Sequence, residues 1–312
     1  MNFETSSRGF LNDGSHGPPR LEIYLNLGTL KDLPANSVCG GLSDEERMGR
    51  LKQDGFQGVQ VEHADPLSFE AVLPHCGLNR VSHPGEADEV FRRHVDRGDR
   101  CLTLHVGWGL ETDADADRLV EAVLTASTRH GLPAFIETHR ATMTQDVWRT
   151  VQLAQRFPEI RFNADFSHYY AGQEMEYGDF EARLDFMQPI FDRTGFMHGR
   201  IASRGCIQAP IESMDQRPLH AVGMQGDYLQ SFISLWTRAM AGFRRHAGPG
   251  DILIFAPELL SAEYDYARLV PDAAGKLVEA TDRYAEALLY RDLALQCYPS
   301  DVIADQTKPE TR

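Results

Sequence analysis

Short apolar runs alternate along the chain with longer segments in which apolar residues recur every three or four positions. Runs of the first kind predict buried parallel strands, and segments of the second kind predict amphipathic helices. The strand-like runs are residues 21–27, 58–61, 78–81, 101–106, 134–137, 161–165, 196–201 and 252–255. Helical patterns cover residues 115–129, 145–156, 180–192, 229–245 and 275–296.

Eight strands that alternate with helices predict an α/β fold, and this number of repeats is that of a (β/α)8 TIM barrel. From the pattern alone, an open doubly wound sheet is the alternative. We expect one barrel domain over residues 21–298. A polar N-terminal tail (1–20) and a C-terminal tail (299–312) flank it, and both are expected to be poorly packed.

Two irregular segments interrupt the regular spacing, residues 202–228 after the seventh strand and residues 259–275 after the eighth. Loops of this length in a compact domain are usually functional. Because both follow strands, both belong to the C-terminal face, where barrel enzymes place their active sites. The 202–228 loop is a candidate lid and also a candidate interface between copies of a homo-oligomer.

Charge and composition narrow the class of partner. The chain carries 46 acidic and 31 basic residues, a net charge of −15 that repels nucleic acid. No apolar run approaches the roughly 20 residues that cross a bilayer, and the first twenty residues lack the apolar core of a signal peptide. Five scattered cysteines without a CxxC motif are typical of reduced thiols. We therefore expect a cytoplasmic protein with a small-molecule partner and no membrane association.

Ionisable side chains stand at the ends of four successive predicted strands. They are Glu137 in IETHR, Asp165 in NADFSH, His198 in FMHGR and Glu258 in FAPE. A barrel brings these strand ends to one axis, where three carboxylates repel each other and are costly to bury without positive charge. Three oxygen donors and one nitrogen suit a divalent cation. We expect one such ion, with Mn²⁺ first and Mg²⁺, Co²⁺ and Zn²⁺ as alternatives.

The segments IETHR, ADFSHYYAGQE, HGRIASRGC and APELL resemble the xylose-isomerase-like barrels known as sugar phosphate isomerases and epimerases. That group includes ketohexose 3-epimerases, hydroxypyruvate isomerases and inosose dehydratases, and it is related to endonuclease IV. The resemblance is strongest over residues 100–270. The D-x-S-H element and its spacing to HGR and APE are specific for the superfamily and carry little information about the substrate.

The resemblance implies a role for each matching residue. Glu137, Asp165, His198 and Glu258 match the metal ligands of the ketose epimerases. Glu137 and Glu258 also match the pair that exchanges a proton with the substrate carbon. His168 matches a histidine that contacts substrate oxygens.

Three further residues are candidate substrate contacts. Arg204, six residues after His198, matches by resemblance an arginine that grips a substrate hydroxyl or carbonyl. Independently of the resemblance, His105 ends the fourth strand and is a candidate pocket wall or extra ligand. Trp108 follows it and is a candidate for rim packing or for stacking on a sugar.

These features predict an enzyme that forms a metal-stabilised enediolate from a small keto-sugar or sugar phosphate. Returning the proton to the opposite face gives epimerisation, and returning it to the neighbouring carbon gives isomerisation. Expelling a leaving group from the same intermediate gives a lyase, such as a dehydratase or a carbon–glycoside lyase. The expected activity is that of a metal-dependent isomerase or epimerase, with the lyase as the alternative.

Two other classes fit the sequence less well. A phosphodiesterase like endonuclease IV carries an Asp-x-His after the histidine of the seventh strand, whereas this chain has PIESMDQ there. Its net charge of −15 also disfavours binding to DNA. A non-catalytic binding barrel has no need of a complete ligand set, and this chain has one.

Overall fold

The computed structural model describes residues 4–5, 8–34, 36–62, 73–214 and 227–298. Within these residues eight parallel strands form a closed barrel, because each strand pairs with the next along the chain and the last pairs with the first. The barrel strands are β3 (Arg20–Asn26), β4 (Gly58–Glu62), β5 (His75–Val81), β6 (Leu102–Val106), β7 (Ala134–Glu137), β8 (Phe162–Ala164), β9 (Thr194–Gly199) and β10 (Asp251–Pro257). The predicted TIM barrel is thus confirmed.

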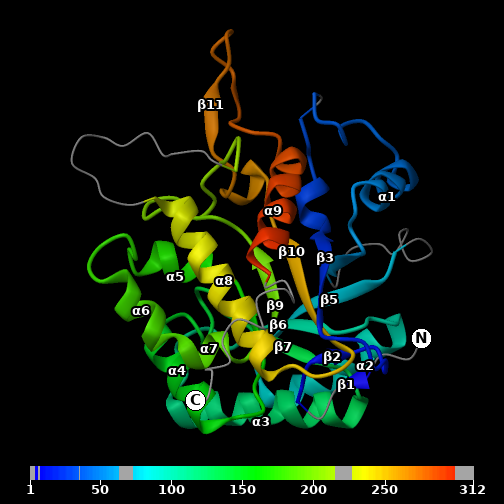
Figure 1. Ribbon diagram of the computed structural model, residues 1–312, viewed down its shortest axis with the longest axis vertical. Coiled ribbons are helices and arrows are strands. Elements are labelled where there is room, and N and C mark those ends of the chain that lie inside the picture. The colour runs from blue at the N-terminus through cyan, green and yellow to red at the C-terminus, as the bar shows by residue number, and fades with distance from the viewer. Residues whose placement is uncertain (1–3, 6–7, 35, 63–72, 215–226, 299–312) are drawn as a thin grey trace, which may run out of the picture.

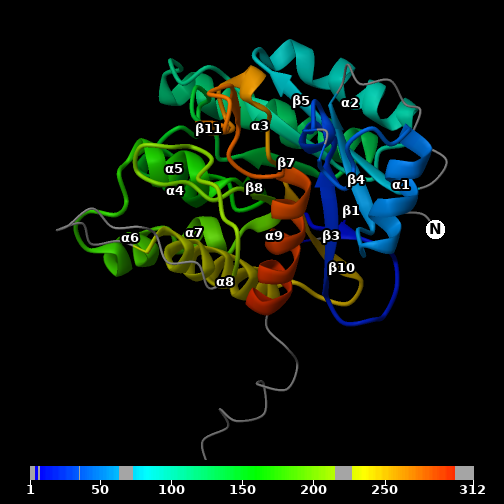
Figure 2. The same ribbon diagram turned by 90° about the horizontal axis from the view of Figure 1, so that it is seen from above.

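Helices surround the strands in both views (Figures 1 and 2). They are α1 (Asp44–Gln53), α2 (Ala87–Arg97), α3 (Asp113–His130), α4 (Val147–Arg156), α5 (Phe166–Gly172), α6 (Phe180–Phe186), α7 (Gln188–Phe191), α8 (Tyr228–His246) and α9 (Arg283–Cys297). None of these described helices has both the length and the apolar character that crossing a membrane requires. All five cysteines are free thiols.

The period of two along each strand decides which side chains enter the barrel. On β10, Ile252 and Ile254 belong to the apolar cluster that fills the barrel interior, whereas Leu253 and Phe255 belong to the larger core that includes the helices. Continuing the alternation directs Glu258 inward. Phe135 and Phe196 also belong to the interior cluster. The same rule therefore directs inward Glu137 and His198, which lie two positions after them. The interior therefore holds an apolar cluster, and the C-terminal end of the barrel is polar.

The N-terminal tail packs better than its polar composition predicts. Two short strands, β1 (Glu4–Thr5) and β2 (Leu11–Asn12), extend the sheet, and β2 pairs antiparallel with the start of β10. Phe10 and Leu11 are fully buried, and the ring of Phe10 packs edge-on against Phe243 at 5.1 Å between ring centroids. The expectation of a poorly packed segment is therefore wrong for these residues, because Leu11 joins the interior cluster and Phe10 joins the larger core. The C-terminal tail (299–312) lies outside the described residues.

Two predicted helices differ from the structure. Residues 180–192 form α6 and α7 instead of one helix, because Pro189 occupies the first turn of α7 and cannot continue a preceding helix. The segment 275–296 becomes helical only at Arg283. Its first part belongs to a hairpin of β11 (Leu269–Pro271) and β12 (Leu277–Glu279), whose turn places Gly275 at a φ of +82°. This hairpin projects beyond the end of the barrel at the top of Figure 1.

A buried carboxyl group ties α9 to the loop that follows β9. Glu286 accepts hydrogen bonds from Ile211 N at 3.1 Å, from the Thr281 hydroxyl at 2.7 Å and from the Tyr290 hydroxyl at 3.0 Å. Burial raises the pKa of Glu286 from 4.5 to about 7, more than these hydrogen bonds lower it. The folded protein therefore holds a proton on Glu286 at pH values where the unfolded chain has lost it.

This carboxyl group predicts a specific pH dependence of stability. Between pH 4.5 and about 7 the folded state binds more protons at Glu286, so the free energy of unfolding falls as pH rises through this window. Glu286→Gln keeps the shape and cannot ionise, so its stability relative to wild type should rise between pH 5 and pH 8 by up to about 3 kcal/mol. Urea unfolding at both pH values measures the difference.

Other groups titrate equally in both proteins and cancel in that difference. Glu45→Gln, at an exposed position on α1, is the matched control and should show no such change. A constant difference between Glu286→Gln and wild type at both pH values would contradict the assignment of a buried neutral carboxyl.

Candidate metal centre

The four strand-end residues predicted to converge do so. Glu137 ends β7, Asp165 directly follows β8, His198 lies in β9 and Glu258 directly follows β10. All four side chains are buried, and each offers a ligand atom within 4.8 Å of those of the others. The sequence prediction of a single cluster of three carboxylates and one imidazole is therefore met by the geometry.

The start of α5 orients the carboxylate of Asp165. Asp165 is the N-cap residue of this helix, and its Oδ1 accepts hydrogen bonds from the Ser167 amide at 3.0 Å and the Ser167 hydroxyl at 2.5 Å. Its Oδ2 points to the cluster, 3.5 Å from His168 Nε2 and 3.3 Å from Arg200 Nη1. The helix cap thus fixes one oxygen and leaves the other for the centre.

A polar network across the barrel fixes the tautomer of His198. The Thr103 hydroxyl donates to the Gly77 carbonyl at 3.1 Å and accepts from Gln60 Nε2 at 2.7 Å, which orients the Gln60 amide. Gln60 Oε1 then accepts from Asn26 Nδ2 and from His198 Nε2, each at 2.8 Å. Because a carbonyl oxygen only accepts, His198 Nε2 carries a proton.

The other ring nitrogen of His198 faces the glutamates. His198 Nδ1 lies 3.2 Å from Glu258 Oε2 and 3.5 Å from Glu137 Oε2. Asn163 Nδ2 donates to Glu137 Oε2 at 3.0 Å, and Asn26 Nδ2 donates to Glu258 Oε1 at 3.1 Å. Nδ1 is therefore the nitrogen of His198 that can ligate a cation shared with both carboxylates.

Arg200 is the charged residue of the cluster that the sequence interpretation missed. Its side chain is only 1% exposed, and its guanidinium forms an ion pair with Glu258 as well as the contact with Asp165. Its Nε donates to the Glu258 carbonyl at 3.0 Å. When His198 has lost its proton to a cation, three carboxylates against one guanidinium leave two negative charges, which is the charge that one divalent cation neutralises.

Burial and neighbouring charges act on the carboxylates in opposite directions. Burial raises the pKa of Asp165 to about 6, outweighing the attraction of Arg200 and His198. Burial also acts on Glu258, but there His198 and Arg200 outweigh it and lower the pKa to about 2. For Glu137 the burial effect is likewise smaller than the attraction of the histidines beside it, so its pKa lies well below 4.5. Both glutamates are therefore ionised at neutral pH.

Of three histidines in or beside the cluster, His198 is charged at neutral pH, whereas His139 and His168 are neutral. Burial lowers the pKa of His198, but Glu258 and Glu137 outweigh it and raise the value to about 10. Burial lowers the pKa of His139 to about 4 against the attraction of Glu137. The pKa of His168 is also well below 6.5, because the ring is buried and lies beside His139. A cation that binds His198 therefore displaces a proton from it.

The donor set fits a divalent cation. Among the carboxylate oxygens of this cluster, Asp165 Oδ2 is buried and accepts no well-formed hydrogen bond from a described residue. Such orphaned acceptors are costly in an apolar interior. Carboxylate oxygens with one imidazole are ligands that Mn²⁺, Mg²⁺, Co²⁺ and Zn²⁺ accept. Glu137, Asp165, His198 and Glu258 would hold the ion.

A cavity opens next to this cluster. It has a volume of about 430 Å³, and its lining includes His168, Arg204, Arg140 and Tyr266. Two predicted substrate contacts, His168 and Arg204, thus face one space. Arg204 lies 3.6 Å from Glu176 and does not enter the cluster, where the arginine is Arg200.

The other two predicted contacts are separated. His105 Nε2 lies 3.3 Å from Glu137 Oε1, at the edge of the cluster. Trp108 is 55% exposed, with the Arg80 guanidinium 4.0 Å from its ring centroid. It borders a different depression, beside His83 and Leu110, and among the described residues it does not line the cavity of His168.

The polar residues that sequence analysis missed share one signal. Asn26, Gln60, Asn163 and Arg200 all stand at inward positions of their strands, in the same period of two as the interior apolar cluster. A buried amide or guanidinium in an otherwise apolar strand marks a polar network. Following every second position along each predicted strand, starting from an apolar residue that faces the barrel interior, would have found them.

No family model and no curated protein matches this sequence. Among solved structures, D-allulose 3-epimerase from Methylomonas sp. has a TM-score of 0.51 at 12% identity, covering 90% of this chain and 99% of that one. The probable 3-DHS dehydratase AsbF of Bacillus anthracis has a TM-score of 0.49 at 12% identity, covering 89% and 100%. At this identity the likeness to the epimerase concerns the fold alone, and it agrees with the expected barrel.

Removing the amide of Gln60 should weaken metal binding without unfolding the barrel. Gln60→Leu deprives His198 Nε2 of its acceptor, so the ring no longer holds Nδ1 toward the glutamates. Loss of such an orienting partner typically lowers metal affinity by about 10–100-fold. Isothermal titration with Mn²⁺ measures the change.

Gln208→Leu is the matched control, because the side-chain amide of this buried glutamine hydrogen-bonds, among the described residues, to the backbone of Leu260. It should bind Mn²⁺ like wild type. Equal Mn²⁺ affinity in Gln60→Leu and Gln208→Leu would show that Gln60 does not position the ligand.

Proposed function

We propose that this chain is a divalent-metal-dependent enzyme that isomerises or epimerises a small keto-sugar or its phosphate. Glu137 and Glu258 are the acid–base pair, and they share the metal with Asp165 and His198. The proposal is supported by a buried group of metal-ligating side chains beside a cavity at the C-terminal end of the barrel.

The placement of the two glutamates is the observation that carries the proposal. Glu137 belongs to β7 and Glu258 follows β10, so two strands of the barrel separate them. Both nevertheless reach the same nitrogen of His198, at 3.5 and 3.2 Å. Two ionised carboxylates that approach one point from different directions are what removal and return of a proton on opposite faces requires.

The chain's own residues supply the proton transfers. One glutamate removes the proton beside the substrate carbonyl, and the other returns a proton to the opposite face or to the neighbouring carbon. A bound divalent cation supplies positive charge that stabilises the developing negative charge on the substrate oxygens. Arg200 lies against Glu258 and Asp165 and keeps both carboxylates fixed in orientation. His168 and Arg204 line the cavity and would contact substrate hydroxyl or phosphate oxygens.

A lyase acting through the same intermediate is the second candidate. The observation that favours it is His168, which lines the cavity and whose two ring nitrogens make no hydrogen bond to a described residue. A neutral imidazole there can donate a hydrogen bond that stabilises a departing hydroxyl group.

Deuterium exchange separates these outcomes. The metal-loaded protein is incubated in D₂O with a panel of keto-sugars and their phosphates, and products are identified by mass spectrometry and NMR. Epimerisation or isomerisation adds label at the exchanging carbon and otherwise keeps the substrate's mass. Elimination releases water or an aglycone. Absence of exchange on every keto-sugar, in protein shown to contain metal, would contradict the proposal.

Glu258→Gln should abolish turnover while the protein stays folded. The substitution removes one base and one anionic ligand, and loss of a catalytic carboxylate typically costs about 10²–10⁴-fold in rate. Circular dichroism checks the fold, and kcat/KM for the substrate found above measures the effect. Glu263→Gln, an exposed residue of the same loop, is the control and should behave like wild type. Activity near that of wild type in Glu258→Gln would contradict the mechanism with two catalytic glutamates.

A further inference from the structure

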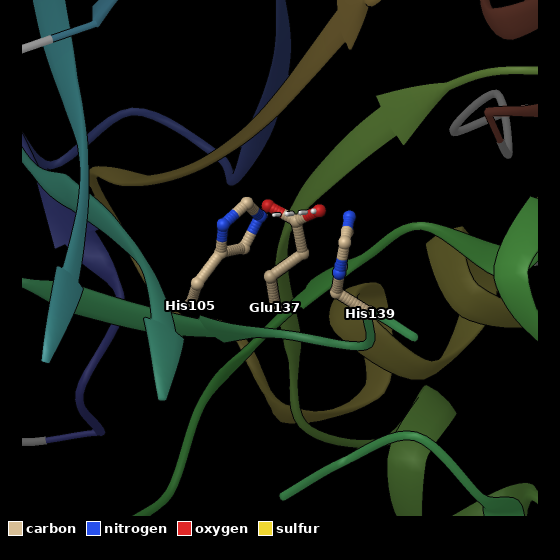
Figure 3. A group of neighbouring side chains, drawn as sticks. All are labelled: His105, Glu137 and His139. Carbon is tan, nitrogen blue, oxygen red and sulfur yellow. Dashed lines mark ion pairs between the residues drawn. The ribbon is translucent and has the colours of Figure 1, made fainter. Parts of the chain in front are cut away.

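A second group of metal-ligating side chains adjoins the buried centre. His105 at the end of β6 and His139 just after β7 lie on either side of the Glu137 carboxylate (Figure 3). Each of the three offers a ligand atom within 4.8 Å of the other two. Glu137 is therefore the one residue that belongs to both groups.

The two oxygens of Glu137 face different partners. Oε2 accepts from Asn163 and lies 3.5 Å from His198, so it belongs to the buried centre. Oε1 lies 3.3 Å from His105 Nε2 and, although buried, accepts no well-formed hydrogen bond from a described residue. The carboxylate is thus positioned to bridge two ions, with one oxygen directed at each.

His139 keeps a ring nitrogen with a lone pair for an ion, and His105 directs its Nε2 at Glu137 Oε1. His139 Nδ1 lies against the carbonyl oxygen of Arg140, which only accepts, so Nδ1 carries the proton and Nε2 has the lone pair. The His105 ring centroid lies 4.2 Å from that of His139, and its side chain is 23% exposed. His139 in turn packs on His168 of the cavity wall, at 3.9 Å between centroids. The group is therefore partly exposed and adjoins one wall of the cavity.

We propose that His105, Glu137 and His139 hold a second divalent cation, bridged to the first by the Glu137 carboxylate. Two imidazole nitrogens and one carboxylate oxygen are the ligand set of open zinc sites and of non-haem iron(II) sites, whereas Mg²⁺ prefers oxygen donors. Zn²⁺, Co²⁺ or Fe²⁺ is accordingly the class of ion for this position.

Electrostatics orders the two binding events. The buried group has three carboxylates, whereas the second group has only the carboxylate that it shares. Once the first ion is bound, Glu137 is already partly neutralised and the two ions repel each other. The second ion therefore binds more weakly than the first, and the two sites fill in sequence.

Zinc titration with reciprocal variants tests this assignment. Calorimetry of the metal-free full chain with Zn²⁺ should give two ions per chain in two steps. His105→Asn/His139→Asn should lose the weaker step and keep the tighter one. His83→Asn, at an exposed histidine outside both groups, is the control and should keep both steps. Circular dichroism verifies the fold of each variant, and the single variants His105→Asn and His139→Asn provide milder changes.

Asp165→Asn affects only the buried group and separates this inference from the proposed function. It should weaken the tighter step by at least tenfold and keep the weaker step. One zinc per chain in wild type, or two unchanged steps in His105→Asn/His139→Asn, would overturn the second site. If, in addition, Asp165→Asn weakens that one zinc, the buried centre stands without the second ion. Insensitivity of all binding to Asp165→Asn would overturn the buried centre instead.

Discussion

Glu137, Asp165 and Glu258 carry three negative charges into a region where none of them is more than 6% exposed. Removing such charges from water costs several kcal/mol per ion, and ion pairs in protein interiors often fail to recover it. Arg200 and His198 supply the opposing charge within the chain. An arrangement this costly adds little to the stability of the barrel, and it is understandable as a site built for a cation.

The rest of the fold holds these charged side chains in place. The barrel interior holds an apolar cluster that includes Phe135, Phe196 and Ile254, and Leu11 of the N-terminal segment belongs to it. Inward positions recur with a period of two along each strand. Each inward polar side chain therefore has a fixed position along the barrel axis. Gln60 and its hydrogen-bonding neighbours then determine which nitrogen of His198 faces the carboxylates.

Strand ends were predictable from sequence because barrel topology converts separate positions into one cluster. Glu137, Asp165, His198 and Glu258 follow apolar runs, so alternation alone placed them. The network around them was not predicted, since Gln60 and Asn26 have no chemistry of their own until the closed barrel sets them opposite His198. The hydrophobic pattern also did not predict local features that depend on a single residue. Pro189 divides a helix, Gly275 turns a hairpin, and Phe10 buries part of a polar segment.

The central claim is that the four buried residues hold a divalent cation, and the metal content of the protein tests it most directly. The protein is purified without chelator, dialysed against metal-free buffer and analysed by elemental mass spectrometry. We predict at least one equivalent of Mn, Mg, Co or Zn per chain, retained through dialysis. No bound ion, even after incubation with each of these metals, would contradict the account. The buried carboxylates would then be compensated by Arg200 and His198 alone.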